Sequence, residues 1–568
     1  MMKKISRRSF LQACGVAAAT AALTACGSGK AETDKKDDAH EAVTFMAPYM
    51  EVEAFIEQVH SVYPEVNVEI VPYSGDNTTT CLQNMFAAGD LPDICTLTVY
   101  NPMTDLVSNK LLDLSGYDFT DNYVESRLQD VFDNGAIYLL PSVYNCYGIT
   151  YNKTLLKKYG WELPNSFAEL EVLAAKAKEA GVDLCLPQIQ YPGYGFQYLC
   201  NIADADFLGT LDGRLWQKDY LSGKANISNT PGMMQAMAYV KKWKDIGMLN
   251  DSGDALDDNA DKFGLMPYLS ENGTQNVFVL KVNRFYGLNK KLKQSPQKLE
   301  DALKVMRVLS TVAGTSALLA ESSRKNSLLP FKDAKADDTY YADIANALNA
   351  GNTAPFIYSG WENTIVTTGL KMLDFIKGNA TMEDVIRQLD EDQDSVVNNT
   401  PDTITTVTEE LSQEDCAMLV GRCFAQATGS DLALVSLSTW IPGNPTEQNH
   451  HGVAAKLYAK GITDYDLSAI LPTGWNRTIQ TVTLTGQQIN DLLATGYDAY
   501  GNGKSYPYVL VSPVQPEAGK TYQVAICGVS DRLAAEATVT DSGVVGMDAA
   551  KAFFGAYTTI SRADTAWS

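Results

Sequence analysis

The chain has 568 residues, of which 45% are hydrophobic, and it carries a formal net charge of −23 at pH 7. A chain of this length can bury more than one hydrophobic core, so we expect two or more globular units. The acidic balance argues against a nucleic-acid partner, because such binding needs clustered cations that replace condensed counterions.

Residues 1–26 are predicted to be a lipoprotein signal peptide, whose residues before Cys26 are removed on export. Met1–Arg8 holds four cations and no acid, and the apolar stretch Phe10–Ala25 is short and rich in alanine. The sequence Leu23-Thr24-Ala25-Cys26-Gly27 resembles the lipobox of bacterial lipoproteins, in which the cysteine takes the lipid. Cys26 is therefore the predicted lipidation site.

The export route has two interpretations. Ser6-Arg7-Arg8-Ser9-Phe10-Leu11 resembles a twin-arginine motif, although Gln12 stands where a lysine is usual, and an ordinary secretory signal is the alternative. Residues 27–42 are small, charged and unpatterned, so we expect a flexible tether. No later apolar run reaches the length of a membrane helix, which predicts a protein on the extracytoplasmic side of the cell membrane, attached through its lipid anchor only.

The ten cysteines do not form a disulfide pattern. Cys416 and Cys423 are seven residues apart on a predicted helix, about 10 Å along its axis and beyond bridging distance. The chain has no C-x-x-C motif, which argues against a structural metal. We expect buried free thiols.

From Val43 onward, β-rich runs alternate with amphipathic helical stretches, which is typical of an α/β fold. Strands are predicted at Val43–Met46 and Val66–Val71, with a helix over Glu51–Tyr63 between them. A further helix is predicted to begin with a capping box at Ser166 and to end at Gly181.

Four segments resemble those of a known family in their order and spacing. They are Phe86-Ala87-Ala88-Gly89-Asp90-Leu91-Pro92-Asp93-Ile94, Leu139-Leu140-Pro141 with Gly148–Leu156, Leu163–Leu170, and Gly378–Val385. Together they resemble bacterial extracellular solute-binding proteins of the sugar-binding type, over residues 43–398. The resemblance implies a periplasmic-binding-protein-like domain with two α/β lobes joined by hinge strands, which close on a solute and deliver it to an ABC permease.

A sugar presents hydroxyls and an apolar face, so its cleft needs aromatic rings beside amides and acids. Two predicted loops and one turn offer that combination, although packing at the surface is the alternative for each. The predicted ligand-binding residues are Tyr144, Asn145, Tyr147, Tyr358, Trp361, Glu362, Asp76 and Asn77. Trp243 lies on the apolar stripe of a helix that begins at Pro231, and we expect it in the core.

The chain departs from the family pattern between Gly247 and Met266. The family usually places a strand and a glycine-aromatic segment there, whereas this sequence has the acidic stretch Asp251–Asp261. We therefore expect the usual ligand contacts to be missing there.

After a predicted linker at residues 399–410, a second unit is expected over 411–568. Gly429–Val435, Gly461–Pro472, Val482–Ile489 and Gly519–Ala525 resemble the C-terminal domain of the bacterial 5'-nucleotidase family. The resemblance implies an α+β domain that binds substrate, while a separate domain of that family holds the metals and performs the chemistry.

The catalytic half of that family is not recognisable in this sequence. A two-metal phosphoesterase needs several histidine and acidic ligands, and the chain has four histidines, of which His450 and His451 are adjacent in a predicted loop. We predict no enzyme activity, no metal and no cofactor. Trp440, Trp475 and Asn476 are the residues that nucleoside binding would use, against a structural or docking role.

The sequence therefore predicts a lipid-anchored solute-binding protein of an ABC importer for a sugar or oligosaccharide, with a non-catalytic nucleotidase-like domain. Two alternatives stay open: a surface hydrolase or binder of nucleotides, and a scaffold whose cleft has lost its ligand.

Overall fold

The computed structural model describes residues 40–567 except 48–51, 72–77, 98–103, 129–131, 134, 190, 252–262, 272–275, 321, 323–326, 335–343, 350, 357–363, 399–401, 440, 442–451 and 499–500. The chain divides into two compact units, Met1–His40 and Glu41–Ser568, and the elements below belong to the second. The lipidation residue Cys26 lies outside the described residues.

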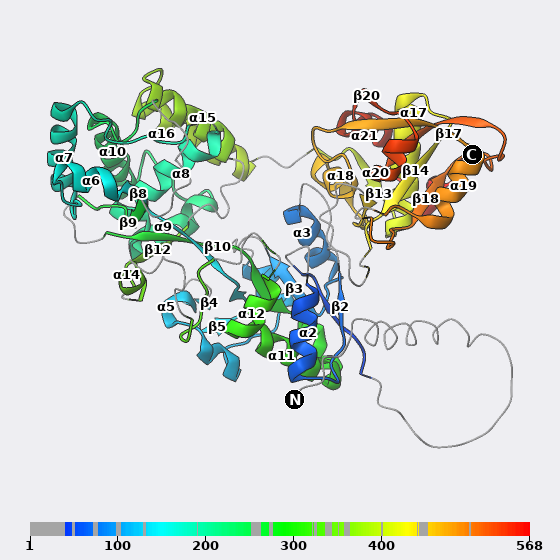
Figure 1. Cartoon of the computed structure of the whole chain (residues 1–568), viewed down its shortest axis with the longest axis horizontal. Coiled ribbons are helices and arrows are strands. Elements are labelled where there is room, and N and C mark those ends of the chain that lie inside the picture. The colour runs from blue at the N-terminus through cyan, green and yellow to red at the C-terminus, as the bar shows by residue number, and fades with distance from the viewer. Residues whose placement is uncertain are drawn as a thin grey trace. The chain divides into compact units, whose positions relative to one another are not determined.

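A five-stranded sheet of order β2-β1-β3-β11-β6 forms the centre of the first lobe (Figure 1). Its strands are β1 (Val43–Phe45), β2 (Val68–Ile70), β3 (Ile94–Leu97), β6 (Leu140–Pro141) and β11 (Phe285–Leu288). β1 is parallel to β2 and β3, and β11 is antiparallel to β3 and β6. The predicted strand, helix, strand unit is confirmed, because α2 (Glu53–Val62) connects β1 to β2 and buries Phe55, Ile56 and Val59.

The remaining helices of this lobe pack around the same core. They are α3 (Thr78–Ala88), α4 (Thr104–Lys110), α5 (Glu125–Leu128), α11 (Pro296–Leu309) and α12 (Val312–Leu318), with the 3-10 turns η1 (Asp118–Asn122) and η5 (Lys290–Gln294) and the small hairpin of β4 (Phe132–Asp133) and β5 (Ala136–Ile137).

The second lobe is mainly helical and has its own core. Its elements are β8 (Ile149–Asn152), β9 (Phe263–Met266), α6 (Lys153–Tyr159), α7 (Phe167–Ala180), α8 (Pro192–Ala203), the π-helical turn η3 (Asp204–Leu208), α9 (Leu211–Leu221), α10 (Pro231–Asp245), α15 (Thr364–Lys377) and α16 (Met382–Asn398). The predicted first and last residues of α7 are confirmed: the Ser166 side chain accepts from the Glu169 amide, and Gly181 ends the helix in the left-handed conformation. The predicted capping box is made only in part, because the Glu169 carboxylate accepts from the Asn165 amide. Trp243 is buried in this core, as its helical stripe predicts.

A short strand lies directly before Met266 in this lobe. β9 pairs antiparallel with β8, from Asn152 opposite Phe263 to Ile149 opposite Met266. This strand, Phe-Gly-Leu-Met, is short and directly follows the acidic stretch in the sequence. Its Gly264 lies close to the ring of Tyr151. A side chain at position 264 would overlap that ring, since an added Cβ would lie 2.4 Å from it.

The C-terminal segment (residues 402–567) contains two sheets, of order β16-β13-β21 and β15-β14-β19-β17-β20, with β18 on β14. Its strands are β13 (Thr405–Val407), β14 (Leu432–Leu437), β15 (Gly452–Val453), β16 (Gly461–Ile462), β17 (Thr478–Thr485), β18 (Tyr508–Val511), β19 (Thr521–Cys527), β20 (Val539–Val545) and β21 (Thr559–Ile560). Its helices are α17 (Gln413–Thr428), α18 (Asp464–Ile470), α19 (Gly486–Thr495), α20 (Asp531–Glu536) and α21 (Gly546–Gly555), followed by the turn η6 (Arg562–Thr565). β13 lies within the predicted linker and pairs with β16 and β21.

All eight cysteines among the described residues are free thiols, as expected. Seven of them are buried, and burial raises the pKa of Cys423 to about 12. Cys416 and Cys423 both lie on α17, as the sequence predicts.

A buried carboxyl group lies where α8 runs into the π-helical turn. Asp204 is 2% exposed, and neither of its side-chain oxygens has a hydrogen-bond partner in the described structure. Burial raises the pKa of Asp204 well above its usual value, and the charge of Arg214 opposes this only in part. Burial therefore favours the protonated form of Asp204 in the folded protein.

The protonated Asp204 makes stability depend on pH with a definite sign. Its folded pKa is raised, so between the unfolded and folded pKa values the native state holds the extra proton and stability falls as pH rises. We expect Asp204→Asn to raise the melting temperature at pH 7 by about 2 °C or more, with a gain that shrinks toward pH 4. Thermal melts of both proteins across this pH range measure the difference.

Asp384 provides a control of opposite sign. The Thr381 backbone N–H, Arg387 and the Thr381 hydroxyl lower the pKa of Asp384 to about 2, so its stabilising effect is present above the unfolded pKa and is lost as pH falls through about 2. Asp384→Asn is expected to lower the melting temperature at pH 7. If the Asp204→Asn gain were the same at pH 4 and pH 7, the protonated-carboxyl account would be wrong.

Candidate functional site

The two lobes are joined by strands that belong to a three-stranded sheet, which we call the hinge sheet. It consists of β7 (Tyr144–Tyr147), β10 (Phe278–Val282) and β12 (Thr353–Pro355), in the order β12-β10-β7. β10 is antiparallel to β7 and parallel to β12. The prediction that Tyr144–Tyr147 is a loop is therefore wrong: the segment is extended because it pairs along its whole length with β10.

The hinge sheet continues into the sheet of the first lobe without a break in hydrogen bonding. Between the paired strands, the Ser142 amide donates to the Arg284 carbonyl at 2.9 Å and the Asn283 amide donates to the Val143 carbonyl at 2.8 Å. The Arg284 amide donates to the Ser142 hydroxyl at 3.0 Å. The two crossings β6–β7 and β10–β11 thus form one antiparallel ribbon from lobe to lobe.

One face of the hinge sheet carries a group of partly exposed side chains, Asn145, Tyr147, Lys281 and Phe356, which we call the hinge-sheet face. Because side chains alternate along a strand, Asn145 and Tyr147 share one face of β7. Lys281 pairs directly with Asn145 in the register of β10 and β7. Tyr147 and Phe356 stack with their centroids 5.2 Å apart, and the Lys281 ammonium lies 5.0 Å from the Phe356 ring centroid.

This combination has the chemistry of a saccharide site. Stacked aromatic rings offer an apolar platform for the face of a pyranose, while an amide and an ammonium provide hydrogen bonds to hydroxyls. Lys281 is held near the rings by their negative faces. Asn145 can both donate and accept, as recognition of a hydroxyl pair requires.

The opposite face of β7 is packed. Tyr144 is fully buried, and its hydroxyl donates to the Arg127 carbonyl at 3.1 Å, while the Arg127 guanidinium lies 5.4 Å from the Tyr144 ring centroid. Arg127 also donates to the Thr353 hydroxyl of β12 at 3.4 Å. In this conformation Tyr144 has no exposed surface, and it ties the end of α5 to the hinge sheet.

Sequence reasoning missed Phe356 and Lys281. Phe356 directly follows β12 and precedes the predicted ligand residues Tyr358, Trp361 and Glu362 by two to six residues, but no motif marks it. Those three, together with Asp76, Asn77 and Trp440, lie outside the described residues. Among the predicted residues, the structure therefore brings together Asn145 and Tyr147.

Trp475 and Asn476, two of the three residues predicted for nucleoside binding, lie in the C-terminal segment after α18. Trp475 is partly buried against the core of that segment and meets the ring of Tyr465 edge-on, with centroids 5.4 Å apart. Asn476 is exposed. One side of the Trp475 indole is thus already used in packing.

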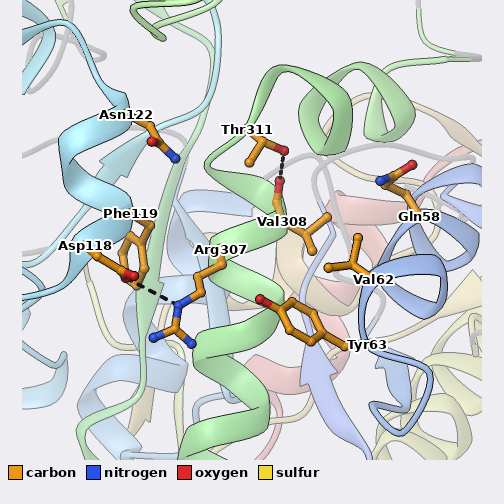
Figure 2. A pocket seen from close by; sticks show the side chains of 9 residues that line it. All are labelled: Gln58, Val62, Tyr63, Asp118, Phe119, Asn122, Arg307, Val308 and Thr311. Atoms are coloured by element: carbon orange, nitrogen blue, oxygen red, sulfur yellow. Dashed lines mark hydrogen bonds and ion pairs between the residues drawn. The ribbon is translucent and has the colours of Figure 1, made fainter.

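The first lobe has a separate pocket of about 250 Å³ on its helical side, drawn in Figure 2. Arg307 points into it and is paired with Asp118 at 3.3 Å and with Glu300 at 3.5 Å, so its charge is largely compensated. The predicted ligand-binding residues do not line this pocket. Its lining residues are Gln58, Val62, Tyr63, Asp118, Phe119, Asn122, Arg307, Val308 and Thr311.

The described residues contain no group of three or more His, Cys, Asp or Glu side chains placed to hold a metal ion, and His450 and His451 lie outside them. Within the same residues no single helix meets the length and hydropathy of a membrane span; Pro296–Leu309 and Val312–Leu319 meet them only as a pair, bent by 84°.

Comparison with known proteins points to one family. Residues 50–262 match the family model of the bacterial extracellular solute-binding proteins. The chain is also 24% identical over 166 residues to the multiple sugar-binding protein of Streptococcus mutans; this alignment covers 28% of the chain and 38% of that relative.

Solved structures show the same fold over the larger part of the chain. A family 1 extracellular solute-binding protein from Bifidobacterium longum subsp. infantis has a TM-score of 0.51 and 17% identity, covering 62% of this chain and 99% of its own. Apo RafE from Streptococcus pneumoniae has a TM-score of 0.50 and 15% identity, covering 64% and 100%. The fold of this part is that of two-lobed solute-binding proteins.

The buried contact beneath the hinge sheet yields a stability prediction. Tyr144→Phe removes the hydroxyl that donates to the Arg127 carbonyl, and we expect it to lower the free energy of unfolding by about 1 kcal/mol. Urea unfolding of both proteins measures this change. Tyr147→Phe, on the partly exposed face of the same strand, should cost less; an equal cost for both variants would contradict the assignment of the two faces.

Proposed function

We propose that this protein is the extracytoplasmic solute-binding component of an ABC importer, that its solute is a sugar or oligosaccharide, and that Cys26 anchors it to the membrane. The observation that carries the proposal is the hinge-sheet face, which offers stacked rings, an amide and an ammonium at the junction of two lobes. The family match over residues 50–262 and the sugar-binding relative support the solute class.

The proposed mechanism is capture by closure. A sugar ring stacks on Tyr147 and Phe356, because its C–H face is apolar, and its hydroxyls bond to Asn145 and Lys281. The crossing strands act as the hinge, so that closure brings side chains of both lobes onto the solute and excludes water. Tyr358, Trp361, Glu362, Asp76 and Asn77 are proposed to complete the site. The closed form then delivers the solute to the permease.

The C-terminal part is proposed to be a non-catalytic domain resembling the C-terminal domain of 5'-nucleotidases, over residues 411–568. Its strands and capped helices are compatible with an α+β domain. The alternative, binding or processing of nucleosides or phosphate esters, would use Trp440, Trp475 and Asn476. The edge-on contact of Trp475 with Tyr465 favours the structural role.

The direct test of the proposed function is a thermal-shift screen of the mature protein against neutral oligosaccharides, adenosine and AMP, followed by calorimetry for each hit. A binder raises the melting temperature with concentration according to its occupancy. Stabilisation by an oligosaccharide supports the proposal. Stabilisation by adenosine or AMP alone would favour the alternative.

The aromatic platform makes a specific prediction for the solute found in that screen. Tyr147→Ala removes one stacking ring and is expected to weaken binding by about tenfold or more, whereas Tyr147→Phe keeps the ring and most of the affinity. Arg307→Ala, in the pocket of Figure 2, serves as a matched control and should leave the affinity unchanged. Equal losses in Tyr147→Ala and Arg307→Ala would place the solute elsewhere.

The anchor makes a prediction about location. Cys26→Ser removes the thiol that takes the lipid, so the variant is expected to leave the membrane fraction and appear in the soluble extracytoplasmic fraction. Fractionation and immunoblotting measure the distribution. A variant that still required detergent for release would show a second membrane attachment.

A further inference from the structure

One side of α3 belongs structurally to the C-terminal segment. Cys81 is 7% exposed and is part of the hydrophobic core that contains Cys416, Leu419 and Phe424 of α17. Met85, one turn further along α3, packs against this core and against the core of the first lobe. An apolar face of a first-lobe helix is thus covered by residues that lie more than 300 positions later in the chain.

Polar contacts surround this apolar contact. In the turn after α3, the Asp90 carboxylate accepts from the Lys456 ammonium at 2.9 Å and from the Tyr458 hydroxyl at 3.0 Å. On α3 itself, the Asn84 amide donates to the Asp466 carboxylate at 2.6 Å, and its oxygen accepts from Lys460 at 2.7 Å.

The two sets of contacts differ in exposure. The Asp466 side chain is 1% exposed and also accepts from Lys460 at 2.8 Å and from the Thr463 backbone at the start of α18. The pair of Asp90 and Lys456 is 45% and 40% exposed, so water and salt reach it. The buried carboxylate gives the contact its geometry, whereas the exposed pair can be weakened without disturbing either core.

We propose that Cys81, Asn84, Met85 and Asp90 form a docking surface for the C-terminal segment, and that this docking is a reversible joint held by charge. The occupant is the surface of the same chain that carries Lys456, Tyr458, Lys460 and Asp466. The joint fixes the C-terminal segment to the first lobe through α3.

The joint has a consequence that rests on the proposed function. If the lobes close on a solute about the hinge sheet, a segment fixed to α3 travels with the first lobe. The C-terminal segment then moves together with the first lobe and does not move independently of it. The test below needs no solute, so its outcome is independent of the sugar-binding proposal.

The experiment follows the thiol of Cys81, which the docked segment covers. The full mature chain is treated with N-ethylmaleimide, and the labelling rate of each cysteine is measured by peptide mass spectrometry. Asp90→Lys and Lys456→Asp each place like charges at the contact, and we expect each to accelerate labelling of Cys81 by about fivefold or more. The double variant, which exchanges the two charges, should restore slow labelling in part, because Lys456 also pairs with Glu410 at 3.3 Å and an acid at position 456 meets that carboxylate.

Two further cysteines report on folding in the same sample. Cys95 is buried in the first lobe and Cys416 in the C-terminal segment, so both should keep their slow rates in every variant. Fast labelling of Cys81 in the unchanged protein, or unchanged labelling in both single variants, would overturn the joint. Parallel acceleration of all three cysteines would also overturn it, because the contact would then be part of one folding unit.

A second measurement uses salt. The exposed pair is screened at high ionic strength, so labelling of Cys81 in the unchanged protein should rise between 0.05 and 1 M sodium chloride, over which the Debye length falls roughly fourfold. Asp90→Asn lacks the pair and should show a smaller dependence. An equal dependence in both proteins would contradict a joint held by charge.

Discussion

The pairing of β10 with β7 and β12 is the constraint on which the arrangement of the lobes depends. β10 uses both of its edges within the hinge sheet and continues after two residues into β11 of the first lobe. A shift of one residue in its register would exchange Lys281 for a buried neighbour and move Tyr147 away from Phe356. The hydrogen-bonded register of β10 with β7 and β12 thus determines how the two lobes are joined and which side chains share the hinge-sheet face.

Local signals in the sequence predict the elements well. Strand β1, helix α2 and strand β2 follow from alternation and helical periodicity, and the ends of α7 follow from Ser166 and Gly181. The predicted helix that carries Cys416 and Cys423 is found as α17. Each of these signals acts between residues fewer than about five positions apart, where sequence and geometry coincide.

The site is less predictable because its contacts are distant in sequence. Asn145 and Tyr147 attract attention as polar and aromatic residues, but only pairing with β10 shows that they share a face and that Tyr144 lies on the other. Phe356 meets Tyr147 across 209 positions, and no short motif predicts this contact. The alternation of buried and half-buried residues in Tyr144–Tyr147 becomes visible only in the structure.

Met85 couples the stability of the first-lobe core to that of the C-terminal core, because it packs against both. Its thioether packs against the core of the first lobe and against the core of the C-terminal segment, so some of its buried surface is lost whichever core opens. The two cores therefore melt with a shared free-energy term. Opening the C-terminal core therefore costs more while the first lobe is folded than after that lobe has opened, so protection of amide hydrogens in α17 reports in part on whether the first lobe is folded.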